Sequence, residues 1–174
     1  MLEAALERAF EAQLIEDGTI AASLTQTQDF WTVRESLPLV KRAFLTSVNH
    51  DVSVPVSKVP EFLHRTGSIL SDRCPGIEIF AFGHIGDGNI HYGVAERAEK
   101  DRSALFKNRH EVTKTVHDIA SELGGSISAE HGVGLLKRDE LETRKSDVSL
   151  HMMRSIKASL DPKNLFNPGR VVRL

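Results

Sequence analysis

Near its middle the chain reads Gly83-His84-Ile85-Gly86-Asp87-Gly88-Asn89-Ile90-His91-Tyr92-Gly93, a glycine-rich turn between two apolar stretches. Asp-Gly between apolar strands is a strong hairpin signal, because a type I′ turn needs a positive φ at both central residues. Centring the turn on Asp87-Gly88 places His84 directly opposite His91. Opposed residues have Cβ atoms roughly 4.5–5.5 Å apart on one face of a sheet, so the two imidazoles are predicted to be neighbours.

The segments around this hairpin alternate between the periods of strands and helices. Apolar residues repeat every second position in the predicted strands and every third or fourth position in the predicted helices. The predicted strands cover 47–54, 77–85, 90–96 and 126–130, and the predicted helices cover 59–73 and 101–123. The order β-α-β-β-α-β is that of a ferredoxin-like fold, an antiparallel sheet with two helices on one face. We therefore expect an α+β fold in which the hairpin is buried on both sides.

Helical segments flank this core in the sequence. Two helices are predicted within residues 1–46, the second interrupted at Pro38, and residues 135–160 also have a helical pattern. We expect residues 1–134 to form the ferredoxin-like domain with its flanking helices, and residues 135–174 to form a C-terminal helical segment.

The composition of the 174 residues argues against several classes of protein. The 22 Lys and Arg nearly balance the 24 Asp and Glu, which argues against a nucleic-acid binder. The sequence has no apolar run of about 18 residues, so no transmembrane helix is expected. The single cysteine, Cys74, offers neither an internal disulfide nor a thiolate cluster. The acidic N-terminal segment lacks the pattern of a signal peptide, and we expect a cytoplasmic protein.

The paired histidines of the hairpin have two interpretations. His84 and His91 are either hydrogen-bonded core residues or ligands of one metal ion, which imidazole binds at about 2.0–2.1 Å. A glycine-rich turn also suits a phosphate group. However, the glycines here do not form G-x-G-x-x-G, and no Gly-Lys-Ser/Thr follows them, so a nucleotide-binding loop is excluded.

A second polar pair, Glu130-His131, follows the last predicted strand and precedes another glycine-rich turn. Glu130 would complete a His-His-carboxylate set with one open coordination position, and His131 would act as a general base near neutral pH. The alternative is an exposed Glu-His pair at a strand end. In an ideal sheet of this topology the fourth strand ends at the edge opposite the hairpin tip. The topology alone therefore does not bring Glu130 to the two histidines.

Taken together, five motifs resemble the C-terminal part of the FAD-linked oxidases of the vanillyl-alcohol oxidase superfamily. The subgroup with the greatest resemblance contains D-2-hydroxyglutarate dehydrogenase, the flavin D-lactate dehydrogenases and the glycolate oxidase D subunit. The matching motifs are Gly83 to His91, Glu130 to Gly134, His50 to Pro55, Leu160 to Asn164, and Asn167 to Arg170.

This resemblance implies an FAD-dependent oxidoreductase that oxidises a small D-2-hydroxy acid to a 2-oxo acid and passes the hydride to FAD. It also implies a divalent metal ion, with zinc as the expected ion. The residues that match the family's site are His84, His91 and Glu130 for the metal, His131 for the hydroxyl proton, Arg34 and Asn49 for the substrate, and Asn89 and Asn167 for FAD. An arginine suits the substrate carboxylate because a guanidinium group binds it in a bidentate manner.

The chain departs from the family pattern at two positions. Asn49 stands where several relatives have a lysine, and Arg170 stands where a lysine is common. Without a cation at position 49, a monocarboxylate substrate is better supported than a dicarboxylate such as 2-hydroxyglutarate.

Family members also have a separate FAD-binding domain, which this sequence does not contain. We expect that domain or subunit to be a partner, and we expect the chain alone to be inactive. Apolar surface on the N-terminal helices would favour a homo-oligomer. The competing hypothesis is a free-standing ferredoxin-like metal-binding or regulatory module without redox activity, because a fold alone does not define a function.

Overall fold

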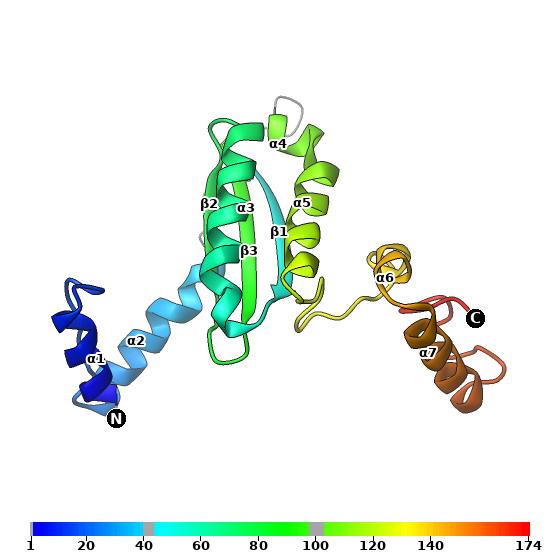
Figure 1. Cartoon of the computed structure of the whole chain (residues 1–174), viewed down its shortest axis with the longest axis horizontal. Helices are drawn as coiled ribbons and strands as arrows, with labels where there is room; N and C mark the ends of the chain where they lie inside the picture. The colour runs from blue at the N-terminus through cyan, green and yellow to red at the C-terminus, as the bar shows by residue number, and fades with distance from the viewer. Residues whose placement is uncertain (1, 40–43, 98–102) are drawn as a thin grey trace. The chain divides into compact units, whose positions relative to one another are not determined.

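The computed structural model describes residues 2–39, 44–97 and 103–174 (Figure 1). The chain divides into two compact units, residues 1–40 and residues 41–174. The first unit contains α1 (Leu2–Glu11) and α2 (Leu24–Ser36). The helix α2 begins after Ser23, whose side chain accepts the backbone N–H of Gln26. The domain boundary that we expected at residue 134 falls within the second unit.

The second unit is built on a three-stranded antiparallel sheet in the order β1-β3-β2, which confirms the α+β class. The strands are β1 (Thr46–Ser53), β2 (Glu78–His84) and β3 (Asn89–Glu96). The central strand β3 pairs along its whole length with β1 and along most of it with β2. Each strand falls within about one residue of its predicted range.

Two helices cover one face of this sheet, α3 (Val59–Arg73) and α5 (Arg109–Glu122), and Figure 1 shows both running alongside the strands. A 3-10 turn, η2 (Val56–Lys58), leads into α3, and the short helix α4 (Ala104–Lys107) precedes α5. The core between helices and sheet contains Phe62, Leu70, Val112, Val116, Tyr92 and Val94. The single long helix predicted at 101–123 is instead divided at Asn108 within the described residues.

The register of the hairpin differs from the predicted one. His84 pairs with Asn89, and His91 pairs with Phe82. The turn is a four-residue loop, 85–88, because Gly88 alone of the two central residues has a positive φ. In addition, the carbonyl of Gly88 accepts the backbone N–H of Val54 and so ties the loop to the end of β1. The pairing is shifted by two residues, so the two histidines still lie on one face.

The fourth strand predicted at 126–130 is absent from the described structure and is replaced by one bridge, Ser53 to Ser126. Ser126 bends the chain out of the sheet, since its hydroxyl donates to the carbonyl of Ser128 and accepts the backbone N–H of the same residue. The prediction of a complete four-stranded sheet was therefore wrong. The segment beyond Ser128 leaves the edge of β1.

The expectation that the hairpin is buried on both sides was also wrong. The strand β2 lies at an edge of the sheet, and its residues are exposed or only partly buried, whereas most of β3 is buried. The face opposite α3 and α5 carries alternate residues of all three strands. We call this the open face.

The C-terminal part contains α6 (Arg138–Arg144) and α7 (Asp147–Leu160) in place of one continuous helical stretch. Ser146 separates them and caps α7 by accepting the N–H of Ser149. Glu140 of α6 lies 2.9 Å from Nδ1 of His117 of α5, and this hydrogen bond joins α6 to the ferredoxin-like core. Within the described residues, no helix has the length and apolar character needed to cross a membrane.

Candidate functional site

The open face brings His84, His91 and Asp51 together. In the sheet register His91 of β3 is directly opposite Asp51 of β1 on one side and Phe82 of β2 on the other. His84 is the next residue after Phe82 on the same face of β2. The imidazole rings of His84 and His91 have centroids 6.2 Å apart in an edge-on arrangement. The Phe82 ring lies 5.1 Å from the ring of His91 and forms an apolar floor beside it.

Glu130 lies between the two histidines. Its Oε1 is 2.7 Å from Nδ1 of His84, and its Oε2 is 3.6 Å from Nε2 of His91. The amide Nδ2 of Asn89 donates to Oε1 of Glu130 and fixes the orientation of the carboxylate. The structure thus brings together the three residues predicted as metal ligands, although the fourth strand that was expected to carry Glu130 does not form.

His131 lies against the same cluster. Its ring stacks on the ring of His91, with centroids 5.5 Å apart and planes 20° apart. Its Nδ1 is 3.7 Å from Oδ2 of Asp51, while 68% of its side chain is exposed. The ring is therefore held by two neighbours and is still open to a ligand approaching from solvent.

Asp51 is the site residue that the sequence reasoning missed. Its side chain is only 4% exposed, and its Oδ2 accepts three successive backbone N–H groups, those of Ala129, Glu130 and His131. Burial alone would raise the pKa of Asp51, but the N–H donors of His131 and Glu130 outweigh it and lower the pKa. The sequence contained one signal for Asp51. In the predicted strand its side chain lies on the same face as Asn49 and on the opposite face from His50.

The surroundings of His91 favour its neutral form. Burial lowers the pKa of His91 below its usual value, and the nearby carboxylates of Glu130 and Asp51 only partly oppose that effect. A neutral imidazole is the form that can donate a lone pair to a metal ion.

The other predicted site residues lie in separate places. Asn49 is on the open face of β1, where it is exposed and pairs with Gly93 of β3. Asn89 starts β3 and is 4% exposed. Asn167 is exposed in the C-terminal segment, with a positive φ of 50°. Arg34 is on α2 in the first unit, which is described separately from the unit that holds the histidines.

Part of this cluster is close enough together to hold a cation. Asp51, His91, Glu130 and His131 each offer one ligand atom, and these atoms all lie within 4.8 Å of one another. His84 adjoins this group through Glu130.

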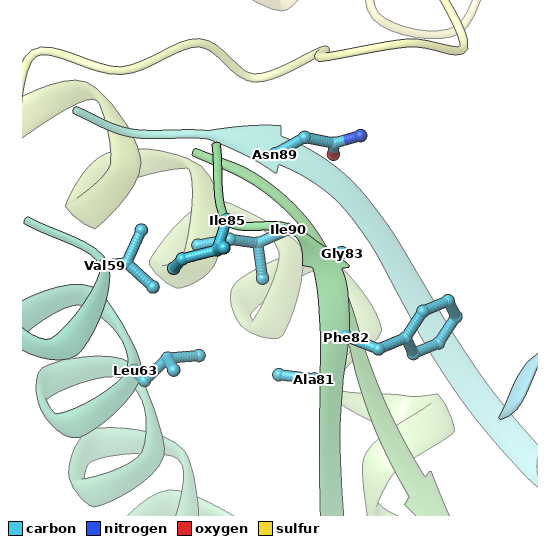
Figure 2. Close-up of a pocket in the computed structure, with 8 residues that line it drawn as sticks. All are labelled: Val59, Leu63, Ala81, Phe82, Gly83, Ile85, Asn89 and Ile90. Atoms are coloured by element: carbon cyan, nitrogen blue, oxygen red, sulfur yellow. The ribbon is translucent and has the colours of Figure 1, made fainter. Parts of the chain in front are cut away.

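A pocket of about 180 Å³ lies beside the hairpin, between α3 and β2 (Figure 2). Val59 and Leu63 of α3 line one side of it, and Ala81 and Ile90 of the sheet line the other. Its lining is apolar except for Asn89, so it offers little chemistry. The cluster on the open face, where the titratable groups converge, is the candidate site.

Comparison with known proteins agrees with this picture. The family described as FAD linked oxidases, C-terminal domain, matches residues 1–171. A D-2-hydroxyglutarate dehydrogenase of Stutzerimonas stutzeri (strain A1501) is 38% identical over 97% of this chain and 36% of the relative. The mitochondrial D-2-hydroxyglutarate dehydrogenase of Arabidopsis thaliana is 32% identical over 98% of the chain and 29% of the relative. A D-lactate dehydrogenase of Archaeoglobus fulgidus is 41% identical over 71% of the chain and 26% of the relative.

The chain spans about a third of the length of the D-2-hydroxyglutarate dehydrogenases that it matches. The family match extends over nearly every residue, and the similarity to the bacterial D-2-hydroxyglutarate dehydrogenase covers both the hairpin and the Glu130-His131 segment. The chain therefore belongs to the family of FAD linked oxidases, C-terminal domain.

Proposed function

We propose that this chain is the substrate- and metal-binding part of an enzyme that oxidises a small 2-hydroxy acid to the 2-oxo acid. Family membership and the names of its relatives support the reaction class. The single observation that carries the proposal is the position of Glu130, whose two carboxylate oxygens face one histidine each. Family membership also favours this function over a free-standing regulatory module.

In this proposal His84, His91 and Glu130 hold a divalent cation, with zinc as the expected ion. Two imidazoles and one carboxylate form the ligand set of catalytic zinc sites, which keep a position open for substrate. A divalent cation in such a site supplies a Lewis acid for substrate oxygens. The polar edge of the cluster is exposed, since about half of the His84 side chain and 41% of the Glu130 side chain reach solvent.

His131 is the proposed general base. Its Nδ1 faces the anionic Oδ2 of Asp51, so the Nδ1–H tautomer is favoured and Nε2 is left as the acceptor. The stacking contact with His91 fixes the plane of the ring. The Nε2 atom can therefore take the proton of a substrate hydroxyl group that approaches over the open face.

Arg34 and Asn49 are the proposed substrate contacts. Asn49 is exposed two residues from Asp51 on the same strand face, where it can donate a hydrogen bond to a substrate oxygen. Arg34 offers the bidentate guanidinium group that suits a carboxylate. We propose a monocarboxylate such as lactate or glycolate as a better substrate than 2-hydroxyglutarate, because position 49 carries no charge.

FAD supplies the hydride acceptor in this proposal and is held mainly by a domain outside this sequence. Asn89 and Asn167 are the proposed flavin contacts: Oδ1 of Asn89 has no hydrogen-bond partner among the described residues, and Asn167 is exposed. Residues 135–174 are proposed to pack toward the flavin domain. Support comes from an exposed apolar stripe on α7 at four-residue intervals, formed by Val148, Met152, Ile156 and Leu160.

The proposal predicts that chemistry and metal binding can be separated by mutation. In the enzyme assembled with its FAD-binding part, His131→Ala should lower kcat by at least about a hundredfold and leave the metal content unchanged. His84→Ala should lose both. Turnover with a 2-hydroxy acid and metal analysis of the same preparations measure the two effects. Full activity in His131→Ala would exclude this residue as the base.

A further inference from the structure

The Glu130-His131 segment has little sheet pairing to hold it in place. Beyond the bridge at Ser126, one further backbone hydrogen bond joins it to β1 among the described residues, a long one of 3.3 Å from the N–H of Ala129 to the carbonyl of Asp51. The backbone N–H groups of Ala129, Glu130 and His131 lie 3.1, 3.0 and 2.9 Å from one atom, Oδ2 of Asp51. Successive N–H groups that converge on one oxygen form an anion-binding nest.

The second oxygen of the same carboxylate faces His91. Oδ1 of Asp51 is buried, has no hydrogen-bond partner among the described residues, and lies 3.6 Å from Nδ1 of His91. A carboxylate oxygen close to Nδ1 favours, by electrostatic attraction, the tautomer that carries its proton on Nδ1, and this tautomer presents Nε2 as the ligand atom. In this structure Nε2 of His91 is the atom that faces Glu130.

From these contacts we infer that Asp51 is the positioning residue of the site: one oxygen holds Glu130 and His131 over the open face, and the other selects the tautomer of His91. This inference deepens the proposed metal site and rests on it. Asp51 replaces the missing fourth strand as the element that brings Glu130 to His84 and His91. It acts through the backbone N–H groups of residues 129–131 and through the neighbouring rings of His91 and His131.

The chain provides a matched control for this role. Asp161 is also buried, and its two oxygens accept the backbone N–H groups of Leu165 and Phe166 at 2.9 Å, while its Oδ2 also pairs with Nζ of Lys157. It therefore makes the same kind of contact in the turn that follows α7. Asp51→Asn and Asp161→Asn each replace an anionic acceptor with a neutral amide of the same shape, and only the first variant affects the segment that carries Glu130.

Two measurements on the 174-residue chain test the inference. Amide hydrogen exchange without metal should show residues 129–131 protected in the wild type and exchanging at least about tenfold faster in Asp51→Asn. Titration with Zn²⁺ by calorimetry should show affinity about 10- to 100-fold weaker in Asp51→Asn, the usual cost of removing a residue that orients a metal ligand. Asp161→Asn should bind Zn²⁺ like the wild type.

Several results would overturn the inference. The first is an Asp51→Asn variant that binds Zn²⁺ as tightly as the wild type. The second is a variant whose amides at 129–131 exchange no faster than those of the wild type. The third is an Asp161→Asn variant that loses as much Zn²⁺ affinity as Asp51→Asn does. Should Asp51→Asn fail to fold, hydrogen exchange of the wild type tests the inference by itself. Protected amides at 129–131 would support the nest, and unprotected amides would contradict it. Should the wild type bind no Zn²⁺, the proposed metal site fails, and the exchange data still decide whether Asp51 positions the segment.

Discussion

At the scale of single residues, the sheet separates two classes of histidine. His50 points toward the helices, where its Nδ1 lies 3.1 Å from the carbonyl oxygen of Tyr92 and its Nε2 lies 3.3 Å from the hydroxyl of Thr113. A neutral ring satisfies both partners by donating to the carbonyl and accepting from the hydroxyl. His50 is thus a hydrogen-bonded core histidine, whereas His84 and His91 lie on the open face among acidic neighbours.

Because His50 is buried, we expect the free energy of unfolding to fall in acid. Burial lowers the pKa of His50 to about 4, against the effect of the Tyr92 carbonyl, while an unfolded chain has the ordinary value of 6.5. The unfolded state therefore binds the proton more readily between these values. The stabilisation is complete above pH 6.5 and is lost as the pH falls toward 4, by about 3 kcal/mol in total.

Urea unfolding of the wild type and of His50→Gln at pH 7 and pH 4.5 measures this contribution. The free energy of unfolding should fall more steeply with acid in the wild type than in the variant. His91, whose pKa is also lowered by burial, lies on the other face of the sheet and contributes equally in both proteins. An identical decline in the two proteins would show that His50 is not the group responsible.

A substitution at position 49 is expected to change the substrate preference. Asn49→Lys adds a cation to the open face, where a second substrate carboxylate would accept a charge-assisted hydrogen bond worth roughly 1.5–3 kcal/mol. The ratio of kcat/KM for 2-hydroxyglutarate to that for lactate should rise by about tenfold or more in the assembled enzyme. Ser57→Lys, which adds the same charge in η2, should leave the ratio unchanged. No shift in Asn49→Lys would place this residue outside the substrate pocket.

Residue types were enough to name the histidines and Glu130 that the structure brings together, but not the contacts that Asp51 makes with them. Two histidines near a turn and a Glu-His pair are visible as chemistry in the sequence. An aspartate in a strand is visible only as a polar residue, because its three N–H donors come from residues 78 to 80 positions later in the chain. Such a contact depends on tertiary structure.

At the scale of elements, the hairpin shows how a tertiary contact determines a turn. The local rule predicted a two-residue turn at Asp87-Gly88, whereas the loop bonds to Val54 through Gly88 and takes four residues. The face of each side chain was still predicted correctly, since a two-residue shift preserves the alternation of a strand. The missing fourth strand has a similar cause, because Ser126 and Asp51 draw the backbone of 126–131 into other hydrogen bonds.

Substitution of Gly83 tests the register that the structure shows for the hairpin. A Cβ at Gly83 would collide with the backbone carbonyl of Asn89 across the strand pair, whereas a Cβ at Gly86 in the loop would meet no described atom within 4 Å. Gly83→Ala should lower the free energy of unfolding by about 1–3 kcal/mol, as overpacking does. Gly86→Ala should change it little. Chemical unfolding measures both, and equal stability of the two variants would contradict this register.

At the scale of the whole molecule, the candidate site lies within the second unit, and apolar side chains remain exposed on both units. The second unit folds around its own core, yet the stripe on α7 and large side chains on α2, such as Trp31, remain exposed. This surface is consistent with a chain that spans about a third of its relatives. The side chains that we propose as ligands all belong to the second unit, so our proposal predicts that this chain binds a cation by itself.

Calorimetric titration of the 174-residue chain with Zn²⁺ tests this central claim most directly. The wild type should bind one ion per chain, and the His84→Ala/His91→Ala double variant should bind at least about a hundredfold more weakly, because it retains only Glu130 of the proposed ligands. Equal binding by the two proteins, or no binding by the wild type at millimolar Zn²⁺, would contradict the account.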